Sequence, residues 1–427
     1  MKVLLISHNP ITTYNNMGKT FLSLFSAFKP EELCQFYLYP TVPDTKCCGS
    51  YYRFTDHDAL HSLTYRNVVG GEITPNLKSH DGFTNEKEER TYRSASSHTE
   101  LARLVRDMIW SISNWDNSCL NAWLDCQFPD IIFVAPGSQE LLYDIAITIS
   151  KERRLPIVAY ICDDFYFLKD NSRTFSAFRR KRIRRRIEEL MHKAALVITI
   201  CPELAERYSK TFGVNATDLM TCPISQIDSN NPTSKKQSPS NLTYMGNLSY
   251  GRGRSILEIG QALESINSTD SKYSFDVYTG NEYPEMLEQL SSCPAIRLHG
   301  FVTGDAYKDA FNSAGVFTHV ESFEEENRER VRYSISTKII ECLASGKPLL
   351  AYGPEDVASM AYLRKNKCAI LAQSQEELTA TVKNVLTQEQ IRKSVVENAL
   401  QTSKHEAKNS QRLHELLETV LDEYSTD

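Results

Sequence analysis

Short, continuous runs of apolar residues, separated by longer and more polar stretches, recur along almost the whole chain. A strand with one face in water alternates apolar and polar residues, whereas a strand buried on both faces does not. The runs therefore predict parallel sheets covered by helices, built from βαβ units in an α/β fold. The predicted strands are Val3–Ile6, Asp130–Val134, Ile157–Ile161 and Leu196–Ile200 in the first half, and Leu242–Met245, Phe275–Tyr278, Ile296–His299, Val316–His319 and Leu349–Ala351 in the second.

A polar segment separates these two sets of strands. Residues 226–240 are rich in Ser and Pro and show no apolar period, which is typical of a linker. We therefore expect two doubly wound, Rossmann-like domains, at residues 1–225 and 241–404. Ligands bind outside the carboxyl ends of the strands in such sheets, so we expect a substrate cleft between the facing domains. Residues 41–97 are polar and irregular, and we interpret them as an excursion from the first domain.

Composition narrows the class of protein. A length of 427 residues suits two or three domains, and 41% hydrophobic with 24% charged residues is usual for a soluble globular protein. The chain has no apolar run of about 18 residues and no signal-peptide pattern at its start. The net charge of −6 does not favour nucleic acid as a partner. The 11 cysteines are scattered without a C-x-x-C pair, which predicts reduced thiols in a cytoplasmic protein.

The segment Ser334–Gly353 reads as a turn, a helix and a buried strand in close succession. We expect Ser336 to cap a helix that begins at Thr337. The free N–H groups at such a helix start suit a phosphate, and Lys338 adds a cation beside them. Glu341, one turn later, would accept hydrogen bonds from a sugar diol. This arrangement predicts a site for a nucleotide diphosphate.

A glycine-rich turn follows the first strand of the second half. Gly246 and Gly253 bracket the turn, and Arg252 gives it a positive charge. Glycine lets the backbone approach a ligand closely, although the same residues also tighten an ordinary strand-to-helix connection.

These two segments resemble the donor site of GT-B glycosyltransferases, especially the large retaining family that builds bacterial surface polysaccharides. The resemblance implies the GT-B fold, with the C-terminal helix in residues 405–427 crossing back to the N-terminal domain. It also implies that Ser336, Thr337 and Lys338 hold the donor diphosphate and that Glu341 holds the ribose. Arg252 stands where the family has a lysine, and Asn247 replaces a family arginine.

Three further residues match donor-binding turns of that family. Gly18 matches a glycine of the first βα turn; the G-K-T sequence around it is not a P-loop, because Thr13 stands where that motif needs glycine. His299 and Gly300 match a turn beside the nucleotide base, and His299 reads equally well as a half-buried structural histidine.

The catalytic group is less clearly marked. The family has a first glutamate eight positions before Glu341, and Tyr333 stands there instead. Glu321, at a strand end, is our candidate substitute. Asp163 is a candidate acid, base or acceptor-orienting residue, and Asp164 a candidate cap. Two adjacent carboxylates are an incomplete ligand set, so we expect no metal and no cofactor.

A basic amphipathic helix is predicted over residues 178–194. Its apolar stripe would pack on the core, while its basic face would be either solvated or placed against an anionic membrane surface. The basic residues are Arg179, Arg180, Lys181, Arg182, Arg184, Arg185 and Arg186.

The sequence thus predicts a metal-independent glycosyltransferase that moves a sugar from a nucleotide-diphosphate sugar. The acceptor would be a saccharide or lipid-linked saccharide in bacterial surface glycan synthesis, with retention implied by the resemblance. We expect a cytoplasmic location, with contact at the inner membrane face through the basic helix. Two alternatives stay open: a non-catalytic GT-B partner subunit of another glycosyltransferase, and a sugar-nucleotide epimerase.

Overall fold

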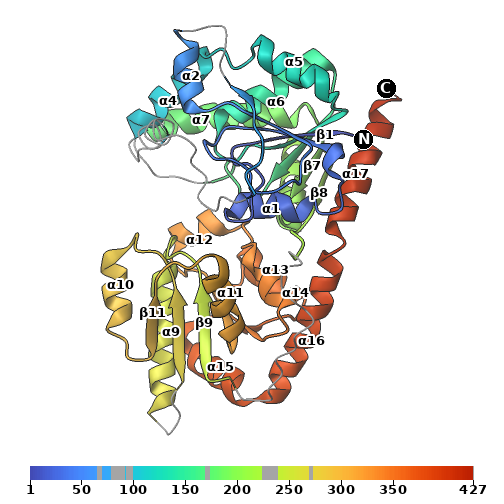
Figure 1. Ribbon diagram of the computed structural model, residues 1–427. Coiled ribbons are helices and arrows are strands. Elements are labelled where there is room, and N and C mark those ends of the chain that lie inside the picture. The colour runs from blue at the N-terminus through green and yellow to red at the C-terminus, as the bar shows by residue number, and fades with distance from the viewer. Residues whose placement is uncertain are drawn as a thin grey trace. The chain divides into compact units, whose positions relative to one another are not determined.

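The computed structural model describes residues 1–64, 70–77, 92, 100–168, 174–223, 239–268 and 273–426. The chain forms two compact units (Figure 1). Unit 1 comprises Met1–Thr221 together with Lys408–Asp427, and unit 2 comprises Cys222–Ala407. The predicted linker, 226–240, lies outside the described residues except for its last two positions.

Unit 1 contains an eight-stranded sheet in the order β4-β3-β2-β1-β5-β6-β7-β8. Every described pairing is parallel except that of β3 with β4. The strands are β1 (Val3–Ser7), β2 (Leu33–Tyr37), β3 (Ser50–Arg53), β4 (Gly71–Glu72), β5 (Ile131–Ala135), β6 (Ile157–Ile161), β7 (Ala194–Thr199) and β8 (Ala216–Asp218). The helices are α1 (Asn16–Leu24), the 3₁₀ helix η1 (Pro30–Glu32), α2 (Asp56–Ser62), α4 (Glu100–Ile112), α5 (Ser118–Gln127), α6 (Glu140–Arg153), α7 (Thr174–Met191), α8 (Pro202–Phe212) and α17 (Asn409–Tyr424).

Strand β1 shows why these apolar runs become buried strands. Val3 and Leu5 belong to a core cluster with Phe21 of α1. Leu4 and Ile6 point to the opposite face, because successive side chains alternate along a strand, and they are equally buried. The sheet is therefore covered on both faces, as the continuous apolar runs predict.

The C-terminal helix α17 is part of unit 1, and this confirms the expectation for the end of the chain. Its residues Leu413, Leu417 and Val420 lie in the same core cluster as β1. Ser410 Oγ donates to Leu24 O at 2.7 Å and accepts from Ala27 N at 2.8 Å, so one hydroxyl ties α17 to the end of α1. Figure 1 shows α17 beside α1.

Unit 2 contains a six-stranded sheet in the order β11-β10-β9-β12-β13-β14, with every described pairing parallel. The strands are β9 (Asn241–Met245), β10 (Ser274–Tyr278), β11 (Ile296–His299), β12 (Val316–Val320), β13 (Leu349–Tyr352) and β14 (Ile370–Ala372). The helices are α9 (Arg252–Asn267), α10 (Pro284–Ser291), α11 (Gly304–Ser313), α12 (Glu325–Val331), α13 (Lys338–Ala344), α14 (Ala358–Lys365), α15 (Gln375–Thr387) and α16 (Glu389–Glu406).

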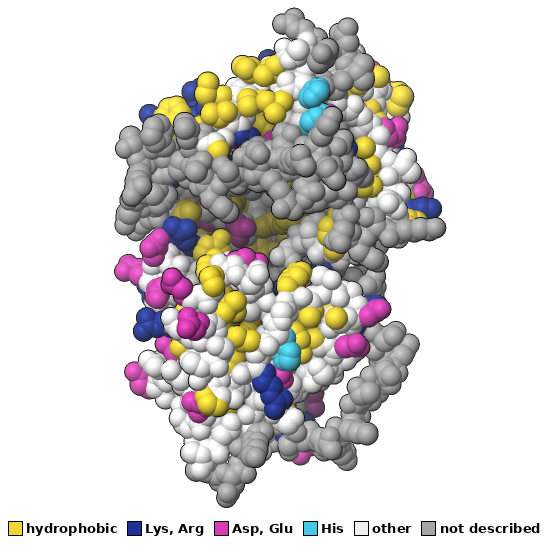
Figure 2. Space-filling view, turned by 60° about the vertical axis from the view of Figure 1, so that its left-hand side comes forward, with side chains coloured by type: hydrophobic (Ala, Val, Ile, Leu, Met, Phe, Trp, Pro, Cys, Tyr) yellow, Lys and Arg dark blue, Asp and Glu magenta, His cyan; other side chains and the backbone are white. Residues whose placement is uncertain are grey.

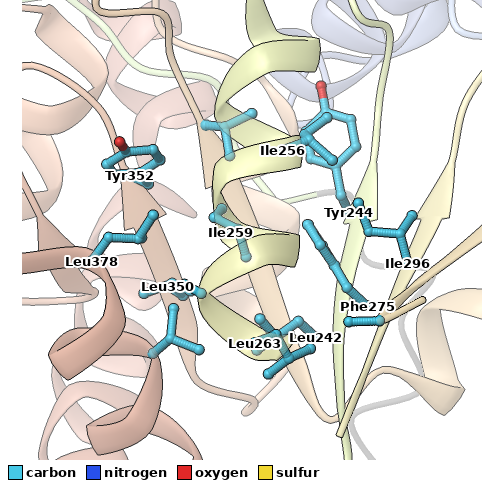
Figure 3. Close-up of a cluster of buried hydrophobic side chains, with 14 of the residues drawn as sticks. Leu242, Tyr244, Ile256, Ile259, Leu263, Phe275, Ile296, Leu350, Tyr352 and Leu378 are labelled. Carbon is cyan, nitrogen blue, oxygen red and sulfur yellow. The ribbon is translucent and has the colours of Figure 1, made fainter. Parts of the chain in front are cut away.

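The core of unit 2 lies between its sheet and helix α9. Ile256, Ile259 and Leu263, spaced to share one face of α9, point toward Leu242 of β9 and Leu350 of β13 (Figure 3). All five side chains are fully buried. Their packing fixes where α9 begins, and therefore where the glycine-rich turn before it lies.

Two expectations about local structure are wrong. Residues 41–97 are not wholly an excursion, because β3 lies there and pairs with β2 in parallel. Helix α13 begins at Lys338 rather than Thr337, and no side chain caps it. Ser336 contributes its carbonyl, which accepts from Ile339 N at 3.0 Å, and the expected hydroxyl cap is absent.

Candidate functional site

Each sheet has one place where the strand order reverses. In unit 2 the chain runs outward from β9 through β10 to β11 and then returns to the other side of β9 as β12. In unit 1 the same reversal separates β1 from β5. Loops diverge at such a switch point and leave a crevice beyond the carboxyl ends of the strands, which is where ligands bind in open α/β sheets. Several of the predicted site residues, among them Arg252, Glu321 and Asp163, lie at these two places.

Arg252 and Glu321 form an ion pair across the switch point of unit 2. Arg252 opens α9, after the turn that follows β9, and Glu321 directly follows β12. Arg252 Nε donates to Glu321 Oε2 at 3.2 Å and Nη2 donates to Oε1 at 3.2 Å. Arg252 Nη1 also donates to Asn247 Oδ1 at 3.3 Å. Glu321 is 2% exposed, so its carboxylate is desolvated and held by its partner.

His319 lies beside this pair. Its Nε2 is 3.4 Å from Glu321 Oε1, and the side chain is buried in β12. Burial lowers the pKa of His319, although the Glu321 charge acts in the opposite direction. His319 is therefore an uncharged neighbour, and Arg252 supplies the positive charge that Glu321 faces.

Lys338 and Glu341 both point to partners within unit 2. Lys338 Nζ donates to Met245 O at 2.9 Å, which connects the first residue of α13 to the end of β9. Glu341 Oε2 accepts from Tyr307 OH of α11 at 2.9 Å. The predicted diphosphate cation and the predicted ribose acid thus lie on adjoining turns of α13. Sequence reasoning missed Tyr307, because nothing near it in the chain marks its contact 34 positions away.

His299 is held at the end of β11 by a buried carboxylate. Its Nε2 lies 3.0 Å from Asp276 Oδ1, and Asn241 Nδ2 donates to Asp276 Oδ2 at 2.8 Å. The ring stacks on Tyr278 with centroids 4.3 Å apart. His299 is still 38% exposed, so one side of this stack is open to a ligand. A Cβ on Gly300 would meet nothing within 4 Å.

Two of the predicted glycines have packing reasons of their own. A Cβ on Gly18 would lie 2.6 Å from Thr12 N, and Gly18 N donates to Asn15 Oδ1, which caps α1. A Cβ on Gly246 would lie 2.7 Å from Tyr244 OH. Both positions exclude larger residues whether or not a ligand binds there.

Unit 1 has a pocket at its own switch point, with a cavity volume of about 180 Å³. Its polar lining residues follow the carboxyl ends of three neighbouring strands: His8 and Asn9 after β1, Ser138 after β5, and Asp163 after β6. Apolar and aromatic side chains complete the lining: Met17, Phe21, Tyr143, Tyr160, Ile161, Phe165, Ile187 and Tyr208. Pro136 and Gly137 also line this pocket.

His8 also lines the pocket, and it was not among the site residues predicted from the sequence. Burial, with a smaller effect from the Arg106 charge, lowers the pKa of His8 to about 3. Its Nε2 lies 3.5 Å from Tyr92 OH. Its buried Nδ1 has no hydrogen-bond partner in the part of the chain that the structure describes. Its position directly after the buried strand β1 is the sequence feature that could have marked it as a site residue.

The two adjacent aspartates have different surroundings. Asp164 Oδ1 accepts from Tyr166 N at 3.0 Å and from Phe167 N at 2.9 Å, so it closes the turn after β6. Asp163 is exposed and lines the pocket. Within the described ranges, no group of three or more His, Cys, Asp or Glu side chains is placed to hold a metal ion.

The predicted basic helix corresponds to α7, and several of its arginines are paired with acids of neighbouring helices. Arg179 Nε lies 3.2 Å from Asp107 Oδ2, and Arg182 Nε lies 3.0 Å from Glu140 Oε1. Arg186 contacts Asp144, Glu140 and Glu189, while Arg184 donates to Tyr166 O. Arg185 pairs with Glu189, and Lys181 is exposed. On the face in Figure 2, basic side chains lie singly or beside acidic ones.

None of the helices in the described residues has the length and apolar character needed to cross a membrane. The cysteines form no disulfide among the described residues. Burial raises the pKa of eight thiols: Cys34, Cys47, Cys48, Cys162, Cys201, Cys293, Cys342 and Cys368. They therefore act as small apolar side chains.

Comparison with known proteins connects this geometry to a family. Residues 259–418 match a protein family described as glycosyl transferase-like. This range includes His299, Glu321, Lys338 and Glu341. No curated protein matches the sequence.

Several solved structures resemble the whole chain. HepE of Anabaena, in complex with UDP and glucose, has a TM-score of 0.60 at 11% identity, over 98% of this chain and 100% of that chain. The α,α-trehalose 6-phosphate synthase of Burkholderia multivorans has a TM-score of 0.63 at 8% identity, over 100% and 97%. The sucrose-phosphate synthase of Thermosynechococcus elongatus has a TM-score of 0.58 at 10% identity, over 99% and 100%. The chain therefore has the GT-B fold, and its residues 259–418 match the glycosyl transferase-like family.

Proposed function

We propose that the protein transfers a sugar from a nucleotide-diphosphate sugar to a hydroxyl of a saccharide or lipid-linked saccharide, in bacterial surface glycan synthesis. One observation supports the proposal: Arg252 and Lys338 both contact residues at the switch point of unit 2, and Glu341 lies one turn after Lys338 on α13. Lys338 contacts the end of β9, and Arg252 contacts the residue after β12. The family match and the fold support the same reading. The HepE protein, of similar fold, has also been solved with UDP-glucose.

In this proposal the two cations bind the donor diphosphate. Negative charge develops on the departing diphosphate during transfer, and fixed positive groups stabilise that charge most effectively when they need no rearrangement. Lys338 is fixed by Met245 O, and Arg252 by Glu321 and Asn247. Ser336 and Thr337 would add backbone and hydroxyl contacts at the start of α13, and Gly18 and Gly246 would allow close backbone approach.

Glu341 would bind the ribose diol, and His299 with Gly300 would lie beside the base. The carboxylate of Glu341 accepts one hydrogen bond from Tyr307 OH and retains further acceptor positions for ribose hydroxyls. The open side of the His299–Tyr278 stack would take the flat face of a base. Glu321, our candidate for the sugar side, is instead proposed to position Arg252, because its buried carboxylate is occupied there.

The acceptor would bind in unit 1, with Asp163 as the candidate group that orients or deprotonates its hydroxyl. Asp163 lines the pocket at the switch point, where an acceptor could approach from solvent. In this proposal no metal takes part, because Lys338 and Arg252 would supply the positive groups that face the diphosphate. Retention at the anomeric carbon follows the family that the sequence resembles, and the anomer formed can be read by NMR of the isolated product.

Contact with an anionic membrane surface is proposed for α7. Exposed Lys181 and Arg185, with partly exposed Arg180, are the basic side chains best placed for it. Co-sedimentation with vesicles of phosphatidylcholine and phosphatidylglycerol measures this contact. Binding should fall when Lys181 and Arg185 are both changed to Glu, and binding that is equal in both proteins would remove the proposal.

The central experiment measures nucleoside-diphosphate release from a panel of nucleotide sugars, with and without a lipid extract as acceptor source. Wild type should release UDP or another nucleoside diphosphate from at least one donor. Lys338→Ala and Glu341→Ala should lose release, while Lys393→Ala, on the exposed face of α16, should keep it. If no nucleotide binds the wild type, the proposed function is wrong. If release persists in both site variants, the residue assignments are wrong.

A further inference from the structure

The pocket of unit 1 contains chemistry that the proposed donor site does not use. Its volume is about 180 Å³, whereas pockets for drug-sized ligands measure roughly 300 Å³ or more. It is therefore sized for one small ring or for the end of a longer molecule. The lining joins aromatic side chains to a few polar groups at strand ends, so a ligand with both apolar faces and hydroxyl edges would suit it.

The polar groups at this pocket are suited to an uncharged ligand. His8 remains neutral at ordinary pH, since burial and the Arg106 charge lower its pKa to about 3. The neutral ring presents Nδ1 as either a donor or an acceptor, depending on the tautomer. A hydroxyl both donates and accepts, so it satisfies Nδ1 in either case, whereas a phosphate oxygen satisfies it in only one.

The charges around the pocket favour the same class of ligand. Asp163 places a carboxylate at the lining, where its negative charge would disfavour an anion and its oxygens are acceptors for hydroxyls. Two cations that lie near the pocket are already paired. Arg106 donates to Asp56 Oδ1 at 2.8 Å and to Gln139 Oε1 at 2.9 Å. Arg179 pairs with Asp107 and donates to Ser138 O at 3.3 Å.

We propose that this pocket binds an uncharged sugar ring, the unphosphorylated end of the acceptor, and discriminates against sugar phosphates. Hydroxyls of the ring would meet His8 Nδ1 and the Asp163 carboxylate. Apolar C–H faces of the ring would pack against the aromatic lining residues. That the bound sugar is the acceptor rests on the proposed function, whereas the class of ligand follows from the residues that line the pocket.

Saturation-transfer NMR on the full-length protein tests the ligand class. The probes are the methyl glycosides of glucose, galactose, mannose and N-acetylglucosamine, with glucose 6-phosphate as the charged comparison. At least one glycoside should bind, and glucose 6-phosphate should bind roughly tenfold more weakly or not at all, because like charges facing each other are unfavourable. Glucose 6-phosphate binding as tightly as the best glycoside, or no glycoside binding at all, would overturn the proposal.

Variants locate the binding and separate it from the donor site. His8→Ala should weaken glycoside binding by roughly tenfold, the loss of one well-placed hydrogen bond. Asp163→Asn should narrow the preference for glycoside over glucose 6-phosphate, and Asp125→Asn, on the exposed end of α5, should change neither. An unchanged preference in Asp163→Asn would contradict the charge argument. UDP binding is measured in parallel. Absence of UDP binding would contradict the proposed function, whereas glycoside binding tests the pocket independently of that function.

Discussion

The two switch points of this molecule are built on the same kind of sheet but offer opposite chemistry. In unit 2 the strand ends hold a desolvated ion pair, a lysine and a glutamate. In unit 1 the corresponding strand ends hold an uncharged histidine, the Asp163 carboxylate and a pocket completed by apolar and aromatic side chains. The backbone architecture selects where a ligand lies, and the few residues after each strand select which ligand it is.

The two places also differ in how their polar groups are satisfied. The charged groups of unit 2 have partners within the unit, so their positions are fixed before any ligand arrives. His8 of unit 1 keeps a buried nitrogen without a partner among the described residues. A buried polar atom without a partner costs about 1–3 kcal/mol, which a ligand hydroxyl would relieve. Four substitutions test this contrast between a site of paired charges in unit 2 and a pocket with an uncharged histidine in unit 1.

Lys338→Ala should have the strongest effect on activity. Removal of one fixed group that stabilises developing charge typically lowers kcat by about 10²–10³-fold, and we expect that loss in UDP release from the preferred donor. The thermal unfolding midpoint should stay close to that of wild type, because Lys338 is only partly buried. A rate within threefold of wild type would contradict the assignment of the diphosphate to unit 2.

Arg252→Ala should have the strongest effect on stability. It leaves Glu321 as a buried charge without its partner, which costs about 3–5 kcal/mol of unfolding free energy. Chemical denaturation measures this loss. The double variant with Glu321→Ala should recover a large part of it, because the stranded charge is removed as well. A double variant as unstable as the single one would show that the pair is not the cause.

His8→Gln should change how the stability of the protein depends on pH. The folded state holds the His8 pKa near 3, below its ordinary value of 6.5, so the unfolded chain binds the proton more readily. The stabilising contribution is complete above pH 6.5 and is lost as the pH falls toward 3. At pH 5 the loss is about 2 kcal/mol. Wild type should therefore lose about that much more unfolding free energy than His8→Gln between pH 7.5 and pH 5. Equal losses of unfolding free energy in the two proteins would show that His8 is charged or exposed in the folded state.

Tyr307→Phe should have the smallest effect. It removes the hydroxyl that donates to Glu341, at a cost of about 1 kcal/mol in unfolding free energy. UDP affinity should change by less than about fivefold, because Glu341 itself remains. Tyr424→Phe, at an exposed position, is the matched control and should change neither quantity. A larger loss of UDP affinity would show that Tyr307 touches the nucleotide directly.

The buried strands with purely apolar sequences could be predicted closely. Ile157–Ile161, a continuous apolar run, has the same limits in the structure as in the sequence prediction. Strand β2 was missed because Gln35 interrupts its apolar run. The structure accounts for this residue: buried Gln35 accepts from Ile11 N at 3.0 Å and donates to Ser7 Oγ at 2.8 Å. A polar residue in a sequence is taken to be exposed to solvent unless its hydrogen-bond partners in the fold are known.

The site was predictable in its residue types and less so in its pairings. Lys338, Glu341 and Arg252 stood out because each has a distinctive local sequence. The pairing of Arg252 with Glu321 joins residues 69 positions apart, and only the adjacency of β9 and β12 brings them together. From the sequence alone, without knowledge of that contact, Glu321 is interpreted as a carboxylate that faces the transferred sugar. Long-range pairing therefore decides the role of a residue whose type and position are already known.

Helix α17 affects the order in which the two units become complete during synthesis. Unit 2 is one continuous stretch, Cys222–Ala407, so all of its residues are made before α17. Most of unit 1 precedes unit 2 in the chain, yet Leu413 and Leu417 in its core follow unit 2. The unit translated first is therefore the one finished last. Until the ribosome releases α17, unit 1 exposes an apolar face beside α1, at the stage when a nascent chain is most open to aggregation and proteolysis.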